Sequence, residues 1–155
     1  MLSGYISSAY GLGADIDIKA KNNIVFQGDN SAIVLQNMED KGNILKLNAN
    51  DIVLTGDKEY GIYQWRSNPY EITAGKDISI FGALAGIRNT ARYNVDNKIE
   101  SDGNIEIVSD KYGVQGQSEG IDSEVFSDED EFINNNNSYI ANNDIKIWER
   151  CRLIL

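Results

Sequence analysis

Short runs of alternating apolar and polar residues recur along this chain in a fixed order. The clearest copy has one run at residues 72–74 and a second at residues 78–80, with Asp77 directly before the second. Alternation with a period of two is the pattern of a β-strand, whereas a helix repeats every 3.6 residues. We therefore expect an all-β chain made of short strands.

Five copies of this pattern share an isoleucine at the start of the second run, directly after Asp or Asn: Ile24, Ile52, Ile78, Ile105 and Ile145. Short Asx side chains suit a sharp corner between strands because they hydrogen-bond to nearby backbone. The first runs are assigned to residues 18–20, 47–49, 72–74, 99–101 and 140–142. A third block, as at residues 60–62, follows in the first four copies, and residues 10–12 are interpreted as the same block of an earlier, incomplete repeat.

Three strands per repeat of about 27 residues predict a right-handed parallel β-helix, whose coils stack about 4.8 Å apart. We expect a single domain over residues 1–155, with coils near residues 10–35, 44–63, 70–88, 98–114 and 139–148. Stacking makes the five isoleucines an internal ladder, and the residues two positions later a second ladder. A β-sandwich is the alternative, but the identical order of three different blocks disfavours it.

The runs at residues 72–80 and the Tyr-Gly-Ile block at residues 60–62 resemble the coils of secreted bacterial β-helical adhesins. These are autotransporter passenger domains and filamentous haemagglutinin-like exoproteins, and the resemblance spans about residues 10–147. It implies attachment to a host-surface protein or glycan at the bacterial cell surface. It also implies that the chain is an uncapped fragment, whose full-length protein is attached to the outer membrane by a β-barrel absent from these 155 residues.

Composition excludes several other classes of function. Acidic residues outnumber basic ones by 24 to 14, which argues against a nucleic-acid partner because such binding needs a basic surface. The chain has no histidine and one cysteine, so His-dependent nucleophile chemistry, His-ligated metals and an internal disulfide are excluded. No cofactor is expected. Residues 1–17 lack the basic start and apolar core of a secretory signal.

The connections from each third block to the next first block vary most in length, and stacking places all of them along one edge. The longest lies in an acidic, Asn-rich insertion at residues 115–139, which holds seven acidic residues. Carboxylates are the ligands that Ca²⁺ prefers, so Asp122, Glu124, Asp128 and Asp130 are weak candidates for a cation site. No known calcium-binding spacing is present, and a flexible solvated insertion is the favoured interpretation.

Aromatic and arginine residues in or beside the shorter connections are the candidate binding residues: Tyr63, Trp65, Arg66, Tyr70, Arg92 and Tyr93. Exposed aromatic rings beside arginine can stack on sugar rings, as a glycan-binding adhesin requires. The same residues can instead pack the connections onto the coil wall.

We therefore expect a surface-exposed, adhesin-like fragment that binds host or glycan surfaces through one edge of a rod. The first alternative is a carbohydrate-active enzyme, because polysaccharide lyases and glycosidases also use the β-helix. Such a site needs converging carboxylates, and the sequence shows only incidental pairs, so no catalytic residue is assigned. The second alternative is a structural spacer without a ligand.

Overall fold

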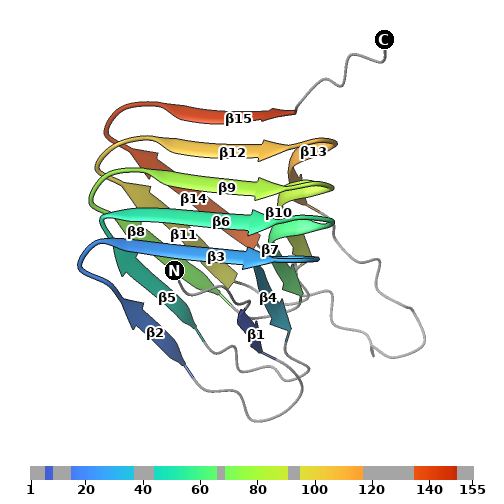
Figure 1. Cartoon of the computed structure of the whole chain (residues 1–155), viewed down its shortest axis with the longest axis horizontal. Helices are drawn as coiled ribbons and strands as arrows, with labels where there is room; N and C mark the ends of the chain where they lie inside the picture. The colour runs from blue at the N-terminus through green and yellow to red at the C-terminus, as the bar shows by residue number, and fades with distance from the viewer. Residues whose placement is uncertain are drawn as a thin grey trace, which may run out of the picture.

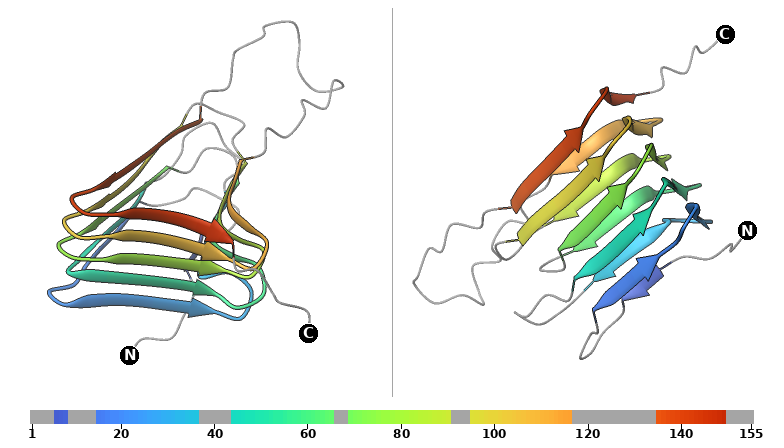
Figure 2. Two further views of the ribbon diagram at one scale, coloured as in Figure 1. Left: turned by 90° about the horizontal axis from the view of Figure 1, so that it is seen from above. Right: turned by 90° about the vertical axis from the view of Figure 1, so that its left-hand side faces the viewer.

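All regular elements in the described residues are β-strands. The computed structural model describes residues 6–8, 15–36, 44–65, 69–90, 95–116 and 135–149, which contain fifteen strands. They form three parallel sheets of five strands each, which make the three sides of a prism (Figures 1 and 2). The prediction of a parallel β-helix is therefore confirmed.

Each sheet takes one strand from every coil. Sheet A holds β1 (Ile6–Ser8), β4 (Ile33–Gln36), β7 (Tyr60–Trp65), β10 (Ala85–Thr90) and β13 (Tyr112–Gly116). Sheet B holds β2 (Ile16–Lys19), β5 (Leu45–Ala49), β8 (Tyr70–Ala74), β11 (Val95–Ser101) and β14 (Asn135–Ala141). Sheet C holds β3 (Asn23–Gly28), β6 (Asp51–Gly56), β9 (Ile78–Gly82), β12 (Ile105–Ser109) and β15 (Ile145–Glu149).

The chain passes from sheet B to sheet C to sheet A in every coil. Seen from above in Figure 2, this path runs anticlockwise as the coils rise toward the viewer, so the helix is right-handed. This is the hand that parallel crossovers prefer, because right-twisted strands pack back on one another only in that sense.

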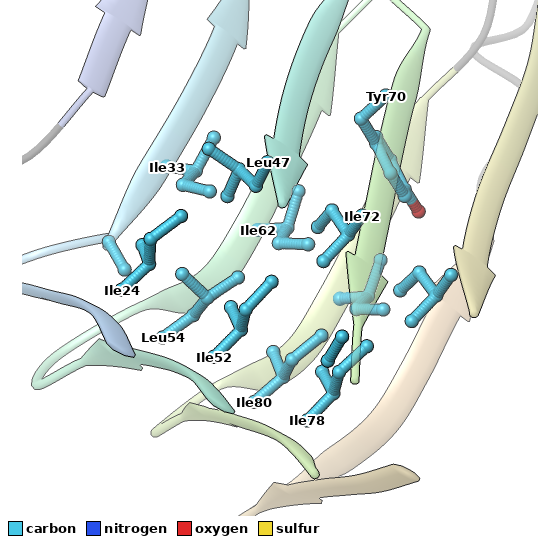
Figure 3. Packing of buried hydrophobic residues seen from close by; sticks show 14 of the residues in the cluster. Ile24, Ile33, Leu47, Ile52, Leu54, Ile62, Tyr70, Ile72, Ile78 and Ile80 are labelled. Carbon is cyan, nitrogen blue, oxygen red and sulfur yellow. The ribbon is translucent and has the colours of Figure 1, made fainter. Parts of the chain in front are cut away.

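The predicted isoleucine ladder is confirmed in sheet C. Strand pairing places the five members in direct register, in the order Ile24, Ile52, Ile78, Ile105 and Ile145. The first four are buried in the single hydrophobic core, part of which is seen in Figure 3, and the last is half-exposed on the end strand β15. The second ladder is also in register: Phe26, Leu54, Ile80, Ile107 and Ile147.

Asx residues hold the corner between sheets B and C, as predicted. The Asp77 carboxylate accepts hydrogen bonds from the backbone N–H of Asn104 at 2.8 Å and from its side-chain amide at 2.9 Å. The Asn104 side chain in turn accepts from the backbone N–H of Asp144 at 3.3 Å. Each corner is therefore hydrogen-bonded to the same corner of the next coil.

Tight glycines form the corner between sheets C and A, a feature that the sequence interpretation did not include. Gly28, Gly56 and Gly82 are register partners. A Cβ atom added to Gly56 would lie 1.9 Å from the carbonyl oxygen of Tyr60, and the other two positions are equally close to backbone oxygens. The backbone therefore turns here at a distance that no other residue allows.

In the last copy of the repeat, the first run was predicted at residues 140–142, and this prediction is wrong by one position. Tyr139, not Ile140, is the register partner of Ile99, while Ile140 pairs with Glu100 and is 43% exposed. A shift of one residue moves a side chain to the opposite face of a strand. The inward residue of this coil is thus an aromatic, which the search for a repeated isoleucine overlooked.

The incomplete first repeat was also assigned to the wrong residues. The strand that pairs with β4 is β1, in which Ile6 is the register partner of Ile33. Residues 10–12, which were interpreted as this block, lie outside the described residues. The coil predicted to start near residue 10 has its first described strand, β2, at Ile16.

Candidate functional site

One long edge of the prism collects the connections that vary in length. Residues 37–43, 66–68, 91–94 and 117–134 each follow a strand of sheet A and precede a strand of sheet B. Because the strands on either side stack in register, the residues flanking these four segments lie along one edge, as the repeat predicts (Figure 2). We call this the A–B edge.

Three of the six predicted binding residues lie in the strands beside the A–B edge. Tyr63 lies within β7 and Trp65 ends that strand. Tyr70 is the first residue of β8. The remaining candidates lie outside the described residues, as do the acidic candidates of the insertion: Arg66, Arg92, Tyr93, Asp122, Glu124, Asp128 and Asp130.

Tyr70 is not a surface residue, and its predicted role in stacking on a ligand is therefore corrected. It shares the inner face of β8 with Ile72 and Ala74, and it is only 1% exposed (Figure 3). Its hydroxyl lies 3.4 Å from the Asn89 side chain. The period of two along β8 places Tyr70 inside the coil, next to the edge and not on it.

Tyr63 belongs to an aromatic and cationic cluster of sheet A, in which Tyr63 and Arg88 are partly exposed and Tyr60 is buried, with 7% of its surface exposed. Its ring centroid lies 5.2 Å from that of Tyr60. The guanidinium carbon of Arg88, on the neighbouring strand β10, lies 5.4 Å from the Tyr60 ring centre and 5.7 Å from that of Tyr63. Arg88 also donates a hydrogen bond from Nη1 to the Tyr60 hydroxyl. Cation–π contacts of this kind stabilise both the charge and the ring positions.

Sequence reasoning missed two members of this cluster, Tyr60 and Arg88. Arg66 and Arg92 were chosen because they are close to aromatic residues in the sequence. Among the described residues, the arginine that contacts these rings is Arg88, the register partner of Tyr63, 25 positions later. The repeat itself carries that signal, because register partners can be read directly from the aligned third blocks.

A buried amide network joins sheets A and B behind the same edge. Gln64 of β7 and Asn97 of β11 exchange two hydrogen bonds, of 2.8 and 2.9 Å. Asn137 of β14 accepts from Asn89 at 2.7 Å and from Asn97 at 2.9 Å. Asn97 also accepts from the backbone N–H of Tyr70 at 3.2 Å. Amide side chains thus link sheet A to sheet B.

Two tyrosines beside this network stay uncharged over the physiological pH range. Burial raises the pKa of Tyr139 to about 12. Burial also raises the pKa of Tyr70 well above its usual value, and Tyr139 adds to this effect, while a hydrogen bond with Asn89 opposes it. The interior behind the A–B edge therefore offers neutral hydrogen-bonding groups that fix geometry, and no titrating acid or base near pH 7.

Metal and membrane-spanning features are not found in the part of the chain that the structure describes. No three His, Cys, Asp or Glu residues there lie close enough to hold a metal ion. None of the described elements is a helix that could cross a bilayer. The surface chemistry available to a ligand in these ranges is therefore that of aromatic rings, amides and individual charges.

Comparison with known proteins gives no relative. No protein-family model, no curated protein and no solved structure matches this chain. Function is therefore inferred from the sequence pattern and from the geometry described above.

Proposed function

We propose that this chain is a binding module of the adhesin type, in which a stiff β-helical rod presents its A–B edge to a glycan-bearing host surface. The observation that carries the proposal is the Tyr60, Tyr63 and Arg88 cluster in the strands of sheet A that lead into that edge, where the buried Tyr60 supports the partly exposed Tyr63 and Arg88. The role needs no covalent chemistry. Its mechanism is display and surface recognition.

The rod supports this role because it is rigid where the connections begin. The isoleucine ladders fill the interior, and the amide network ties β7 and β10 of sheet A to β11 and β14 of sheet B. A surface whose supporting residues are already ordered loses less conformational entropy when it binds. Connections of different length can therefore vary while their anchor points stay fixed.

The cluster supports a glycan as the ligand because of its mixed chemistry. A tyrosine ring offers a flat apolar face to the C–H groups of a sugar, and its hydroxyl and a guanidinium offer hydrogen bonds to the sugar hydroxyls. Arg88 also holds the two rings together, so the surface is formed before a ligand arrives.

Export to a bacterial surface is part of the same proposal. It is supported by the resemblance of the repeat at residues 72–80 to secreted β-helical adhesins, and by a chain with one cysteine and no histidine, which needs neither disulfide nor histidine-ligated metal to fold. Attachment of a longer protein to the outer membrane would keep the rod at the cell surface.

The test is binding of the purified chain to an array of neutral and sialylated oligosaccharides. We expect saturable binding to a subset of the array, reduced about tenfold by Tyr63→Ala, which corresponds to the loss of one aromatic contact. Tyr112→Ala is the matched control, because Tyr112 is an exposed tyrosine two coils away with its own cation contact to Lys111.

Binding that Tyr63→Ala and Tyr112→Ala reduce equally would contradict the assignment to the cluster. No binding by the unmodified chain across the array would contradict the glycan-binding role itself and would favour a structural spacer.

A further inference from the structure

A row of alternating charges crosses the outer face of sheet B. Asp17, Lys46, Glu71 and Lys98 are register partners on β2, β5, β8 and β11, the neighbouring strands of four successive coils (Figure 1). A negative charge therefore stands opposite a positive one at each step from coil to coil. Ser138, the register partner of Lys98 on β14, ends the row without a charge. We call the four charged residues the charge row.

The members of the charge row interact across coils. Lys46 Nζ lies 3.2 Å from Glu71 Oε2 on the next coil. The pKa of Lys98 is raised, mainly by its hydrogen bond with Glu100 and in smaller part by the charge of Glu71. The side chains of Lys46 and Glu71 are 47% and 38% exposed, so dissolved salt screens their attraction. The charge row is thus a surface feature whose strength depends on ionic strength.

The core of the rod discriminates poorly between a correct and an incorrect neighbouring coil. On the inner face of sheet B, three successive coils carry aliphatic register partners: Leu47, Ile72 and Ile99. The isoleucine ladder of sheet C repeats a single residue type. Apolar contact is non-directional, so a coil that pairs with the next but one buries nearly the same side chains. The entropy of closing a loop also rises only slowly with its length, so a looped-out coil is not strongly penalised by chain closure.

The charge row does distinguish these two arrangements. Pairing of neighbouring coils places opposite charges together at every step of the row. Pairing that skips one coil would place Asp17 opposite Glu71 and Lys46 opposite Lys98, so both contacts would join like charges. Opposite charges on adjacent strands stabilise their pairing, and like charges directly opposite one another destabilise it.

We infer that the charge row is a register device of the rod, which directs each coil to stack on its neighbour in the sequence. It disfavours pairing with the next but one coil, whether that coil belongs to the same chain or to a second copy. The device acts during assembly of the rod and is independent of the ligand proposed for the A–B edge.

The test exchanges two charges of the row and keeps the composition of the chain. Lys46→Glu combined with Glu71→Lys keeps the net charge and the favourable contact between these two positions. It creates like-charge contacts at the other two steps, and it makes both coil-skipping contacts favourable. After dilution from urea into about 10 mM NaCl, we expect the yield of monomer to fall about threefold below that of the unmodified chain. We expect the difference to disappear in about 1 M NaCl, where the screening length is only about 3 Å.

Cross-linking with a carbodiimide, which joins a lysine to a carboxylate in direct contact, identifies the coils that have paired. Mass spectrometry of the unmodified chain should detect the link between Lys46 and Glu71. The oligomeric fraction of the exchange variant should contain new links between positions 17 and 71 and between positions 46 and 98. Those links can form only where a coil has been skipped.

The matched control inverts the charge row and keeps its alternation. Asp17 lies 3.0 Å from Lys19, and Lys98 lies 2.6 Å from Glu100, so the inversion includes these two neighbours. Six substitutions reverse every sign without changing the net charge: Asp17→Lys, Lys19→Asp, Lys46→Glu, Glu71→Lys, Lys98→Glu and Glu100→Lys. We expect this control to refold as the unmodified chain does, because every contact between opposite charges is retained.

Three results would overturn the inference. The first is an equal yield of monomer from the exchange variant and the unmodified chain at low salt. The second is an equal loss for the exchange variant and the inverted control, since alternation would then be irrelevant. The third is a loss that persists undiminished at high salt, or that occurs without the coil-skipping cross-links, because mispairing driven by charge would then not be its cause.

Discussion

Single residues decide whether the coil can turn from sheet C into sheet A. At Gly28, Gly56 and Gly82 the backbone lies so close to a carbonyl oxygen at or just before the start of the following strand that a methyl group has no space. The fourth coil has Ser109 at the equivalent position, where the hydroxyl accepts a hydrogen bond from the Lys111 N–H at 3.3 Å. The fourth coil therefore accommodates a serine at this position, whereas a Cβ atom in the geometry of Gly56 would clash with Tyr60 O.

Gly56→Ala is expected to lower the free energy of unfolding by about 2–3 kcal/mol, since its Cβ would lie 1.9 Å from Tyr60 O. Gly75→Ala is the matched control, because its Cβ meets only the Asn50 side chain at 3.2 Å and has space to adjust. Urea unfolding followed by circular dichroism measures both. Equal losses for the two variants would contradict the structure of this corner.

The buried tyrosines make stability depend on alkaline pH. Tyr139 has a pKa of about 12 in the folded chain and about 10 when unfolded, so the unfolded state loses its proton first. The stability that the buried, protonated Tyr139 contributes is complete below pH 10. It is lost as the pH rises through the pKa of Tyr139 in the folded chain. Between pH 8 and pH 11 the loss from this residue is about 1.4 kcal/mol.

Tyr139→Phe is expected to remove that part of the pH dependence, whatever its effect at pH 8. Urea unfolding of both proteins at pH 8, 9, 10 and 11 measures it, and lysine titration is common to both and cancels in the difference. Parallel curves for the two proteins would show that Tyr139 is not buried as described.

At the scale of the strand, register determines which side chains enter the core. Residues that align across coils share a face, and a misalignment of one position exchanges the inside for the outside. The last coil shows this effect, because Tyr139 points inward beside Ile99 while Ile140 lies outside beside Glu100.

Ile99→Ala and Ile140→Ala provide the test of that register. Ile99 is fully buried, so its truncation should cost about 2–5 kcal/mol, whereas Ile140→Ala should change stability by less than about 0.5 kcal/mol. The pair keeps the chemistry of the substitution constant and changes only the face. A larger loss for Ile140→Ala would restore the alignment that a repeated isoleucine first indicated.

The sequence predicted the architecture well because the central strand repeats the same residue types in each coil. Ile52, Ile78 and Ile105 each follow an Asp or Asn and precede another aliphatic residue by two positions, so alignment is unambiguous. The buried amides were missed although the pattern places them inside: Gln64 and Asn89 stand two residues after inward isoleucines. A search for alternating hydrophobic residues overlooks a polar residue on an inner face, because it treats every inward position as apolar.

The candidate site was less predictable because its members come from different coils. Tyr63 was identified, but its partners Tyr60 and Arg88 become evident only when register is used to compare strands. Contacts across coils require the register, which local sequence does not contain.

At the scale of the whole molecule, the three faces of the prism differ in chemistry. Sheet A carries the tyrosine and arginine cluster. Sheet C carries three apolar side chains in register: Phe81, Val108 and Trp148. Sheet B presents alternating charges in register, with Lys46 and Glu71 3.2 Å apart, and these charges satisfy one another. Sheets A and C therefore carry aromatic side chains on their walls, whereas the outer face of sheet B carries paired charges.

The account depends most on the coils being stacked in parallel register, and isoleucine methyl NOEs in a deuterated sample test this directly. Neighbouring coils lie about 4.8 Å apart, so strong cross-peaks should join Ile24 to Ile52, Ile52 to Ile78 and Ile78 to Ile105. Pairs two coils apart, at about 9.6 Å, should give much weaker peaks or none. Absence of the neighbouring-coil peaks, or NOEs that join sequential strands in antiparallel pairs, would contradict the structure and the function proposed from it.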